Sequence, residues 1–335
     1  MTDTTALWRG RDDSGDSGDT RRWHHVVRRF DDDTRAGVAL IGFACDEGVR
    51  RNGGRPGASE GPAALRAALA NMPLHDEPAL YDAGDVACDD GALEDAQARL
   101  ATRVAQVRAR NSLPVVLGGG HEIAFGTFQG LASSLSPHTR ILIVNLDAHF
   151  DLREAAEGNS GTPFRQIQEW CVERGMSFDY RVLGVSRYAN TRALFDRADR
   201  LGVRYWEDER LQDLAGAAKA CADLADDLAR ADAIYLTICL DVLPGDKAPG
   251  VSAPAALGVP LACIERSVDT IVASGKVAAV DIAEFNPRFD RDAMTARVAA
   301  RLIARVARGA ARAGWLPPAG ARFETARAAS GRTRS

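Results

Sequence analysis

Residues 141–151 read ILIVNLDAHFD, an apolar run that ends in two carboxylates and an imidazole. The run Ile141–Leu146 predicts a strand covered on both faces, as in a parallel sheet. Since alternate side chains of a strand share one face, we expect Asp147, His149 and Asp151 to point the same way. Local turn bonding would explain one aspartate, whereas three aligned groups would repel and desolvate one another unless a cation lay among them. The stretch therefore predicts a buried strand with a metal site at its end.

Similar apolar runs alternate with helical patterns along the chain. The predicted strands are Val38–Phe43, Leu80–Tyr81, Val115–Leu117, Ile141–Leu146, Arg181–Val185, Val203–Trp206, Ile234–Leu240 and Val277–Ile282. The predicted helices are Gly61–Ala70, Gly91–Arg110, Glu122–Leu131, Phe164–Arg174, Thr191–Arg200, Ala215–Arg230, Leu261–Ala273 and Ala293–Ala311. This alternation predicts one doubly wound α/β domain, in which ligands bind beyond the carboxyl ends of the strands.

The ends of the chain differ in composition from its middle. Residues 1–35 contain the polar stretch RDDSGDSGDT, so we expect a partly mobile N-terminal segment. Residues 36–315 contain no Pro/Gly/Ser-rich linker and are expected to form a single domain. Residues 316–335 are rich in Ala, Arg, Ser and Thr, and we expect them to form a disordered tail.

The composition narrows the class of protein. Of the 335 residues 46% are hydrophobic, which is enough for a substantial core, and the net charge of −4 does not indicate a nucleic-acid surface. The six cysteines show no C-x-x-C spacing, which is typical of a reducing compartment. The sequence has neither a signal-peptide pattern nor an apolar run of about 18 residues. We therefore expect a cytoplasmic protein with no nucleic-acid or membrane partner.

Polar groups also follow other predicted strands. The segment GGGHE at residues 118–122 follows Val115–Leu117, and its spacing matches neither common phosphate-loop pattern. Its glycines would allow a sharp turn and a close approach to a bound group. A lone histidine after a strand is more often structural than a ligand. However, the chain has only six histidines, and two of them, His121 and His149, lie just past buried strands, which favours His121 as a ligand.

Two further strand ends carry Cys239 with Asp241, and Asp281 with Glu284. Any one of these acidic residues could cap the helix that follows it. However, burying an unpaired carboxylate costs free energy, and four strand ends that carry such groups favour one shared site. Carboxylates with imidazole suit Mn²⁺ and, less specifically, Fe²⁺, Ni²⁺ or Zn²⁺. The number of ligands indicates two ions, which typically activate a shared water for hydrolysis at an electrophilic carbon.

The chain from about Leu40 to Ala307 resembles the ureohydrolase (arginase/agmatinase) family. The resemblance rests on Gly118–Glu122, Asp147–Asp151, Cys239–Asp241 and Glu284–Pro287. It implies a three-layer αβα sandwich around a mostly parallel sheet of about eight strands, as in arginases and deacetylases. It also implies two Mn²⁺ ions per subunit, and relatives of this kind often assemble into homo-oligomers.

Segments outside these motifs resemble the branch of the family that hydrolyses N-formimidoyl-L-glutamate to L-glutamate and formamide in L-histidine degradation. They are Trp8–Asp12, Arg22–His24, Gly42–Asn52, Ser160–Phe164, Gly184–Thr191 and Pro249–Pro254. The arginine-cleaving branch has a histidine shortly after Ser-Gly, where this chain has Thr162–Phe164. A different ureohydrolase activity, on a guanidino acid or agmatine, and an inactive metal-binding homologue are the alternatives.

The resemblance also implies roles for individual residues. One Mn²⁺ would be held by His121, Asp147, Asp151 and residue 239, and the second by Asp147, His149, residue 239 and Asp241. Asp147 would bridge the two ions. Glu284 would bind the cationic formimidoyl nitrogen, and Asp151 would carry a proton to the leaving amine.

Residue 239 departs from the family pattern, because Cys239-Leu240-Asp241 stands where Asp-x-Asp is usual. Three interpretations remain open for Cys239. It could be an unligated thiol that leaves the second metal weakly bound, or a thiolate ligand that favours Zn²⁺ or Fe²⁺ over Mn²⁺. It could also mark a mononuclear or inactive site.

The substrate of this branch carries two carboxylates, which need cationic or amide donors. The candidates in loops are Arg50, Arg51, Asn52, Arg55, Arg153, Arg187 and Asn190. Each could instead be an exposed surface residue. We predict Arg187 and Asn190 as the binding pair because they follow a buried strand.

Overall fold

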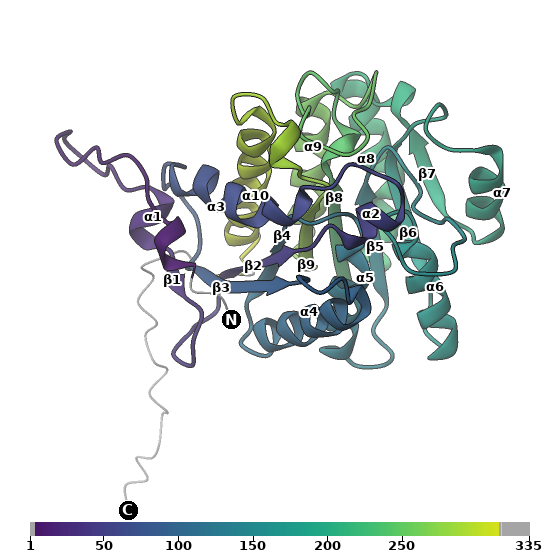
Figure 1. The fold of residues 1–335 in the computed structure, drawn as a ribbon, viewed down its shortest axis with the longest axis horizontal. Coiled ribbons are helices and arrows are strands. Elements are labelled where there is room, and N and C mark those ends of the chain that lie inside the picture. The colour runs from purple at the N-terminus through teal and green to yellow at the C-terminus, as the bar shows by residue number, and fades with distance from the viewer. Residues whose placement is uncertain (1–3, 315, 317–335) are drawn as a thin grey trace, which may run out of the picture.

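Nine parallel strands form one sheet in the computed structural model, which describes residues 4–314 and 316. The strands are β1 (Arg28–Arg29), β2 (Val38–Ala44), β3 (Leu80–Ala87), β4 (Leu113–Leu117), β5 (Ile141–Leu146), β6 (Asp179–Val185), β7 (Arg204–Glu207), β8 (Ala233–Cys239) and β9 (Val277–Ala283). Their order across the sheet is β1-β3-β2-β4-β9-β8-β5-β6-β7. Strands β4, β9, β8 and β5 therefore lie side by side at the centre (Figure 1).

Helices cover both faces of the sheet (Figure 1). They are α1 (Trp23–Val26), α2 (Glu47–Arg51), α3 (Gly61–Ala70), α4 (Leu93–Arg108), α5 (Ile123–Ser133), α6 (Pro163–Glu173), α7 (Arg192–Arg200), α8 (Leu214–Arg230), α9 (Leu261–Ala273) and α10 (Met294–Arg312). Helices α3, α10, α9 and α8 pack in a row on one face, and α4, α5 and α6 pack in a row on the other. The predicted three-layer αβα sandwich is confirmed.

The predicted sheet was one strand short. Strand β1 was missed because Arg28 and Arg29 are both exposed and give no apolar signal. Every sheet pairing is parallel, so the expectation of a mostly parallel sheet is met in full. The helices α1 and α2 were also missed, because four- and five-residue helices are too short to show a helical period.

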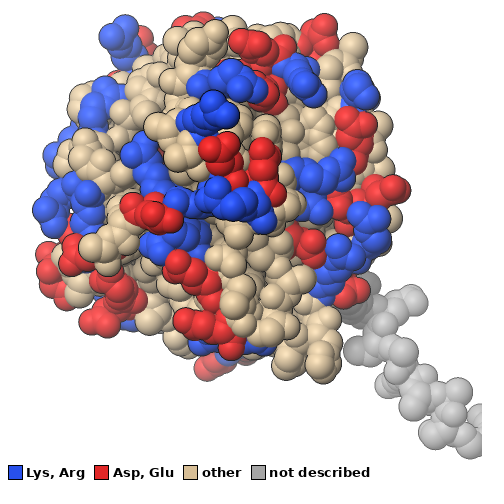
Figure 2. All heavy atoms as spheres, turned by 90° about the vertical axis from the view of Figure 1, so that its right-hand side faces the viewer, with Lys and Arg blue, Asp and Glu red and all other residues tan. Residues whose placement is uncertain are grey.

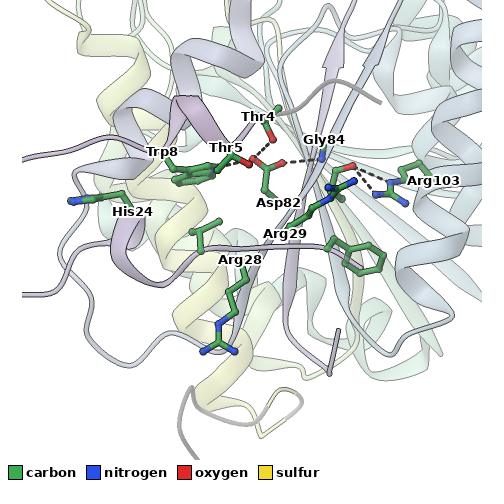
Figure 3. A pocket seen from close by; sticks show the side chains of 12 residues that line it. Thr4, Thr5, Trp8, His24, Arg28, Arg29, Asp82, Gly84 and Arg103 are labelled. Carbon is green, nitrogen blue, oxygen red and sulfur yellow. Dashed lines mark hydrogen bonds between the residues drawn. The ribbon is translucent and has the colours of Figure 1, made fainter. Parts of the chain in front are cut away.

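The segment before β2 is held against the sheet by a buried ion pair. The guanidinium of Arg66 forms two hydrogen bonds with Asp82, of 2.8 and 2.9 Å. The same carboxylate accepts hydrogen bonds from Thr4 Oγ1 (2.8 Å) and Trp8 Nε1 (2.6 Å), and Figure 3 shows both side chains turned toward it. A cavity of about 220 Å³ lies beside this cluster, at the β1 edge of the sheet.

The division into residues 1–35, 36–315 and 316–335 stays a prediction, and residues 317–335 lie outside the described residues.

Charged side chains of both signs are interspersed on the face that carries α6, α7 and β7 (Figure 2). Within the part of the chain that the structure describes, no helix is both long and apolar enough to cross a membrane.

Candidate metal centre

The four central strands deliver the candidate ligands to one edge of the sheet. His121 lies in the turn that follows β4, and Asp147 directly follows β5. Asp241 lies in the 3-10 turn η4 (Leu240–Val242) after β8, and Glu284 directly follows β9. Because parallel strands all end at the same edge, residues distant in sequence meet there. The structure thus brings the four strand ends together, and the roles of their residues stay predictions.

The glycine turn after β4 aims His121 into this site. Gly119 has a φ of 76°, and a Cβ added there would lie 2.8 Å from the carbonyl oxygen of Phe43. Only glycine fits such a left-handed and crowded position without strain. Glycine at this turn therefore allows the backbone to approach the neighbouring strand β2 closely. This close packing fixes the backbone from which the His121 side chain projects.

The imidazole of His121 faces two carboxylates at ion-pair distance. Its Nδ1 lies 3.0 Å from Asp147 Oδ2 and 2.9 Å from Asp151 Oδ2. Nevertheless Nδ1 is buried and has no hydrogen-bond partner among the described residues. Its Nε2 lies 3.0 Å from Thr237 Oγ1. A buried ring nitrogen crowded by two carboxylate oxygens, without a hydrogen bond, is the arrangement expected of ligands around a shared cation.

A second group of ligand atoms adjoins the first. His149 Nδ1 lies 3.1 Å from Asp241 Oδ2 and 3.5 Å from Asp147 Oδ1. The ligand atoms of Asp147, His149 and Asp241 lie within 4.8 Å of one another, as do those of His121, Asp147 and Cys239. Asp147 belongs to both groups. The residues could therefore hold two cations that share one carboxylate.

The electrostatics of the site favour bound positive charge. Burial and the neighbouring Asp147 carboxylate raise the pKa of Asp151. Burial also raises the pKa of Glu284 to about 8, and Asp241 and Glu122 add to this effect. Burial lowers the pKa of His121, but the carboxylates of Asp147 and Asp151 outweigh burial, so that the pKa lies well above its usual value. Each of these shifts reflects acidic groups placed together out of water, which a cation would stabilise.

Two of the site residues have unusual backbone conformations. Asp151 has a φ of 49° and Glu284 a φ of 67°, in the left-handed region that residues other than glycine seldom adopt. Such strain persists only where the surrounding structure holds it, and it is concentrated at functional sites.

The strand geometry expected for the segment Asp147–Asp151 is wrong. Strand β5 ends at Leu146, so the three side chains do not alternate along a strand but project from a loop. Asn190 holds this loop, since its Oδ1 accepts from Phe150 N (3.1 Å) and its Nδ2 donates to Ala148 O (2.8 Å). The three side chains still converge, because hydrogen bonds to the loop, rather than the alternation of a strand, fix their directions.

Cys239 is the last residue of β8 and is buried among the candidate ligands. Burial, Asp147 and Asp241 all raise the pKa of its thiol. The thiol is therefore near enough to take part in binding a cation, but it favours the protonated form unless a cation is bound. Its role as a ligand stays a prediction.

Supporting residues that the sequence did not single out lie behind Asp147. Asn145 Nδ2 donates to Asp147 Oδ2 and to the hydroxyl oxygen of Tyr180, at 2.9 Å each. The only sequence signal was a polar residue inside the apolar run Ile141–Leu146. Such bonds fix the orientation of a ligating carboxylate.

The residues expected to bind the substrate carboxylates differ in whether their side chains already have partners in the protein. Arg187 forms an ion pair with Glu207 (2.6 Å) and its side chain is 61% exposed. The amide of Asn190 is already used to hold the loop described above. The other candidates that donate to carboxylates, carbonyls or a hydroxyl are Arg50, Arg51, Asn52 and Arg55. Among the described residues, the side chain of Arg153 has no such partner, and its Cδ and Nε lie close to Gly161.

The parallel α/β sandwich and the paired groups of buried carboxylate and imidazole ligands define a metal-dependent hydrolase. The chain belongs to the Arginase family, whose profile matches residues 36–308.

Relatives from two bacteria are each 51% identical to this chain and are both named formimidoylglutamase. The Cupriavidus pinatubonensis protein aligns over 91% of this chain and 99% of its own length, and the Chromobacterium violaceum protein over 88% and 95%. A formiminoglutamase structure from Trypanosoma cruzi with Mn²⁺ has a TM-score of 0.71 at 27% identity, covering 82% of this chain and 93% of its own. The Bacillus subtilis formimidoylglutamase, at 23% identity, shares the fold with a TM-score of 0.77 over 89% of this chain and 96% of its own.

Proposed function

We propose that this protein hydrolyses N-formimidoyl-L-glutamate to L-glutamate and formamide, as a step of L-histidine degradation. The observation that carries the proposal is 51% identity over nine-tenths of the chain to relatives named formimidoylglutamase. The site supports the same chemistry, because its ligand groups suit hydrolysis at an amidine carbon.

We propose that two Mn²⁺ ions are bound. His121, Asp147, Asp151 and Cys239 would hold one ion, and Asp147, His149, Cys239 and Asp241 the other. The buried Nδ1 of His121, which has no hydrogen-bond partner among the described residues, and the shared Asp147 fit this assignment. When bound, such ions would lower the pKa of a water molecule and so supply hydroxide at neutral pH.

In this proposal Glu284 binds the cationic formimidoyl group. Its Oε1 accepts a hydrogen bond from the backbone N–H of His121 (2.9 Å), which fixes the carboxyl group beside the ligands. The second oxygen is then available for a charge-assisted hydrogen bond to the amidinium. This contact would hold the substrate carbon at the edge of the ligand cluster.

Asp151 is the proposed proton carrier to the leaving glutamate amine. Its pKa is raised by burial and by Asp147, which favours uptake of a proton after attack. Its Oδ2 lies 2.9 Å from His121 Nδ1, beside the other candidate ligands.

For the substrate carboxylates we propose Arg153 in addition to the predicted pair Arg187 and Asn190. Arg153 lies two residues beyond Asp151, and no hydrogen bond or ion pair to the described residues occupies its side chain. Asn52 Nδ2 lies near the same glycine, Gly161, and donates to Ser160 Oγ (3.1 Å). A guanidinium and an amide from two different loops, both near Gly161, offer donors suited to a carboxylate.

The test is turnover by purified protein loaded with Mn²⁺. We expect formamide release from N-formimidoyl-L-glutamate, loss of activity on chelation and recovery when Mn²⁺ is restored. Urea release from a guanidino acid or agmatine would support the alternative ureohydrolase activity. No turnover of any of these substrates would support an inactive metal-binding homologue.

The remaining features of the proposal concern the whole protein. We propose that it acts in the cytoplasm, that residues 36–315 form the catalytic unit and that the protein forms homo-oligomers. Fractionation of cells, a truncation at residue 35 and light scattering test these three points separately.

A further inference from the structure

We infer that Glu122, acting through α2, positions the part of the site that is proposed to bind the substrate carboxylates. This part, the carboxylate corner, consists of Asn52, Ser160, Gly161 and Arg153. The inference rests on the proposed function and deepens it. It assigns Glu122 as a positioning residue, because its side chain bonds to the backbone of α2 and not to the substrate.

The side chain of Glu122 is buried against the first turn of α2. Its Oε1 accepts a hydrogen bond from Gly48 N over 3.1 Å. Its Oε2 is buried and has no hydrogen-bond partner among the described residues. A Cβ added to Gly48 would lie 2.6 Å from this Oε2, so the helix packs directly on the carboxyl group. The contact between Glu122 and α2 therefore depends on one hydrogen bond and on glycine at residue 48.

The backbone around Glu122 is held by other groups. Gln97 Nε2, from α4, donates to the carbonyl oxygen of Glu122 over 2.8 Å. The N–H of His121 donates to Glu284 Oε1 over 2.9 Å. Neither hydrogen bond uses the Glu122 side chain. A substitution of that side chain should therefore leave the turn that carries His121 in place and change only the contact with α2.

The backbone of Gly48 continues the link to the carboxylate corner. Its carbonyl oxygen accepts from Ser160 N over 3.1 Å. At the end of α2, Asn52 Nδ2 donates to Ser160 Oγ over 3.1 Å. The carbonyl oxygen of Gly161 accepts from Arg153 N over 2.9 Å. A Cβ added to Gly161 would lie 3.1 Å from Asn52 Nδ2 and 2.8 Å from Arg153 Cδ, so these donors lie side by side.

The helix α2 has a second anchor at the surface. Arg51 Nη1 donates to Glu94 Oε1 over 2.7 Å, and this pair is exposed. Loss of the buried Glu122 contact should therefore shift α2 and Asn52 without unfolding the helix. Since such a shift weakens contacts that the bound substrate and the transition state share, KM should rise while kcat changes little.

The test compares two substitutions in the full chain loaded with Mn²⁺. Glu122→Met removes the acceptor at similar side-chain length, and Glu122→Gln keeps it. We expect Glu122→Met to raise KM for N-formimidoyl-L-glutamate about tenfold, with kcat within about threefold of the wild type. Glu122→Gln should keep KM within about threefold. Gly48→Ala, which forces the same contact apart from the α2 side, should raise KM as Glu122→Met does.

Two further readouts need no substrate. By hydrogen exchange and mass spectrometry, residues 47–52 should exchange about tenfold faster in Glu122→Met than in the wild type. Mn²⁺ affinity, measured by titration calorimetry, should stay within about twofold. Asp227→Asn is the control, because it changes a buried carboxylate on α8 that is paired with Arg181. It should alter neither KM nor these two readouts.

Wild-type KM and wild-type exchange in Glu122→Met and Gly48→Ala would overturn the inference. Equal increases of KM in Glu122→Met and Glu122→Gln would also overturn it, as would a loss of Mn²⁺ affinity that parallels the loss of activity. A wild type that releases no formamide would contradict the proposed substrate. The exchange of residues 47–52 would then decide separately whether Glu122 holds α2 in place.

Discussion

The carboxylate of Glu284 is anchored to the backbone of His121, whose N–H donates to Glu284 Oε1 over 2.9 Å. The residue proposed to bind the substrate and a residue proposed to bind a cation are therefore fixed by one turn. Glu284 has a left-handed φ of 67°, which turns the chain sharply at the end of β9. In the proposed function, the substrate and the cation would therefore meet residues that the same glycine turn holds.

Glu284→Gln tests the contact with the substrate. The amide oxygen can still accept from His121 N–H, but the charge that pairs with the amidinium is lost. Since a hydrogen bond to a charged group contributes about 1.5–3 kcal/mol, kcat/KM should fall about 10- to 100-fold. Steady-state kinetics provide the measurement, and Mn²⁺ content should not change. A variant as active as the wild type would exclude Glu284 from substrate binding.

Cys239→Asp restores the acid that is usual at this position in the family. Carboxylates suit Mn²⁺ and thiolates suit softer ions, so we expect tighter Mn²⁺ binding and weaker Zn²⁺ binding, each by about tenfold. Elemental analysis and competition titrations measure both effects. Cys239→Ala is the comparison, because it removes the thiol without adding a ligand. Identical metal content and rate in all three proteins would show that residue 239 does not bind metal.

Arg153→Ala separates the candidates for carboxylate binding. Arg153 has no competing partner among the described residues, so its loss should raise KM about tenfold or more with little change in kcat. Arg187→Ala should raise KM less, because Arg187 would have to give up its ion pair with Glu207 to bind the substrate. The opposite order of effects would indicate that Arg187 is the main carboxylate ligand.

Asp227 should make stability depend on pH in acid. Hydrogen bonding to Arg181 lowers its pKa to about 2 from the model-peptide value of 3.8, although burial opposes the shift. Because the pKa is lower in the folded protein, the stabilisation of about 2 kcal/mol is present above pH 4 and is lost as the pH falls toward about 2.

The measurement is the difference in melting temperature between the wild type and Asp227→Asn. This difference should be largest at neutral pH and should narrow from pH 4 downward. A difference that stays constant across this range would show that the ionisation of Asp227 is not linked to folding.

Much of the fold could be predicted because the buried face of a helix or strand requires apolar residues at regular spacing in the sequence. Helix α9 begins and ends at the predicted residues, Leu261 and Ala273, because its apolar face has a clear helical period. Strand β3 was predicted only as Leu80–Tyr81, since Asp82, Gly84 and Asp85 interrupt the apolar run. Asp82 is tolerated there because Arg66, a partner from another element, neutralises it.

The sequence by itself determined the order of the strands and helices along the chain, apart from β1, α1 and α2, and the residue types that could bind a cation. The order of the elements follows from the local spacing of apolar residues. The possible ligands follow from the chemistry of Asp, Glu, His and Cys side chains, and neither requires information on tertiary contacts. Only the tertiary structure decided how the ligands meet. The loop Asp147–Asp151 is shaped by Asn190, and the ring of His121 is held by Thr237 of a strand far along the chain. These arrangements depend on hydrogen bonds between elements that are distant in sequence. Such hydrogen bonds produce no periodic pattern of residues, so they could not be predicted from the sequence.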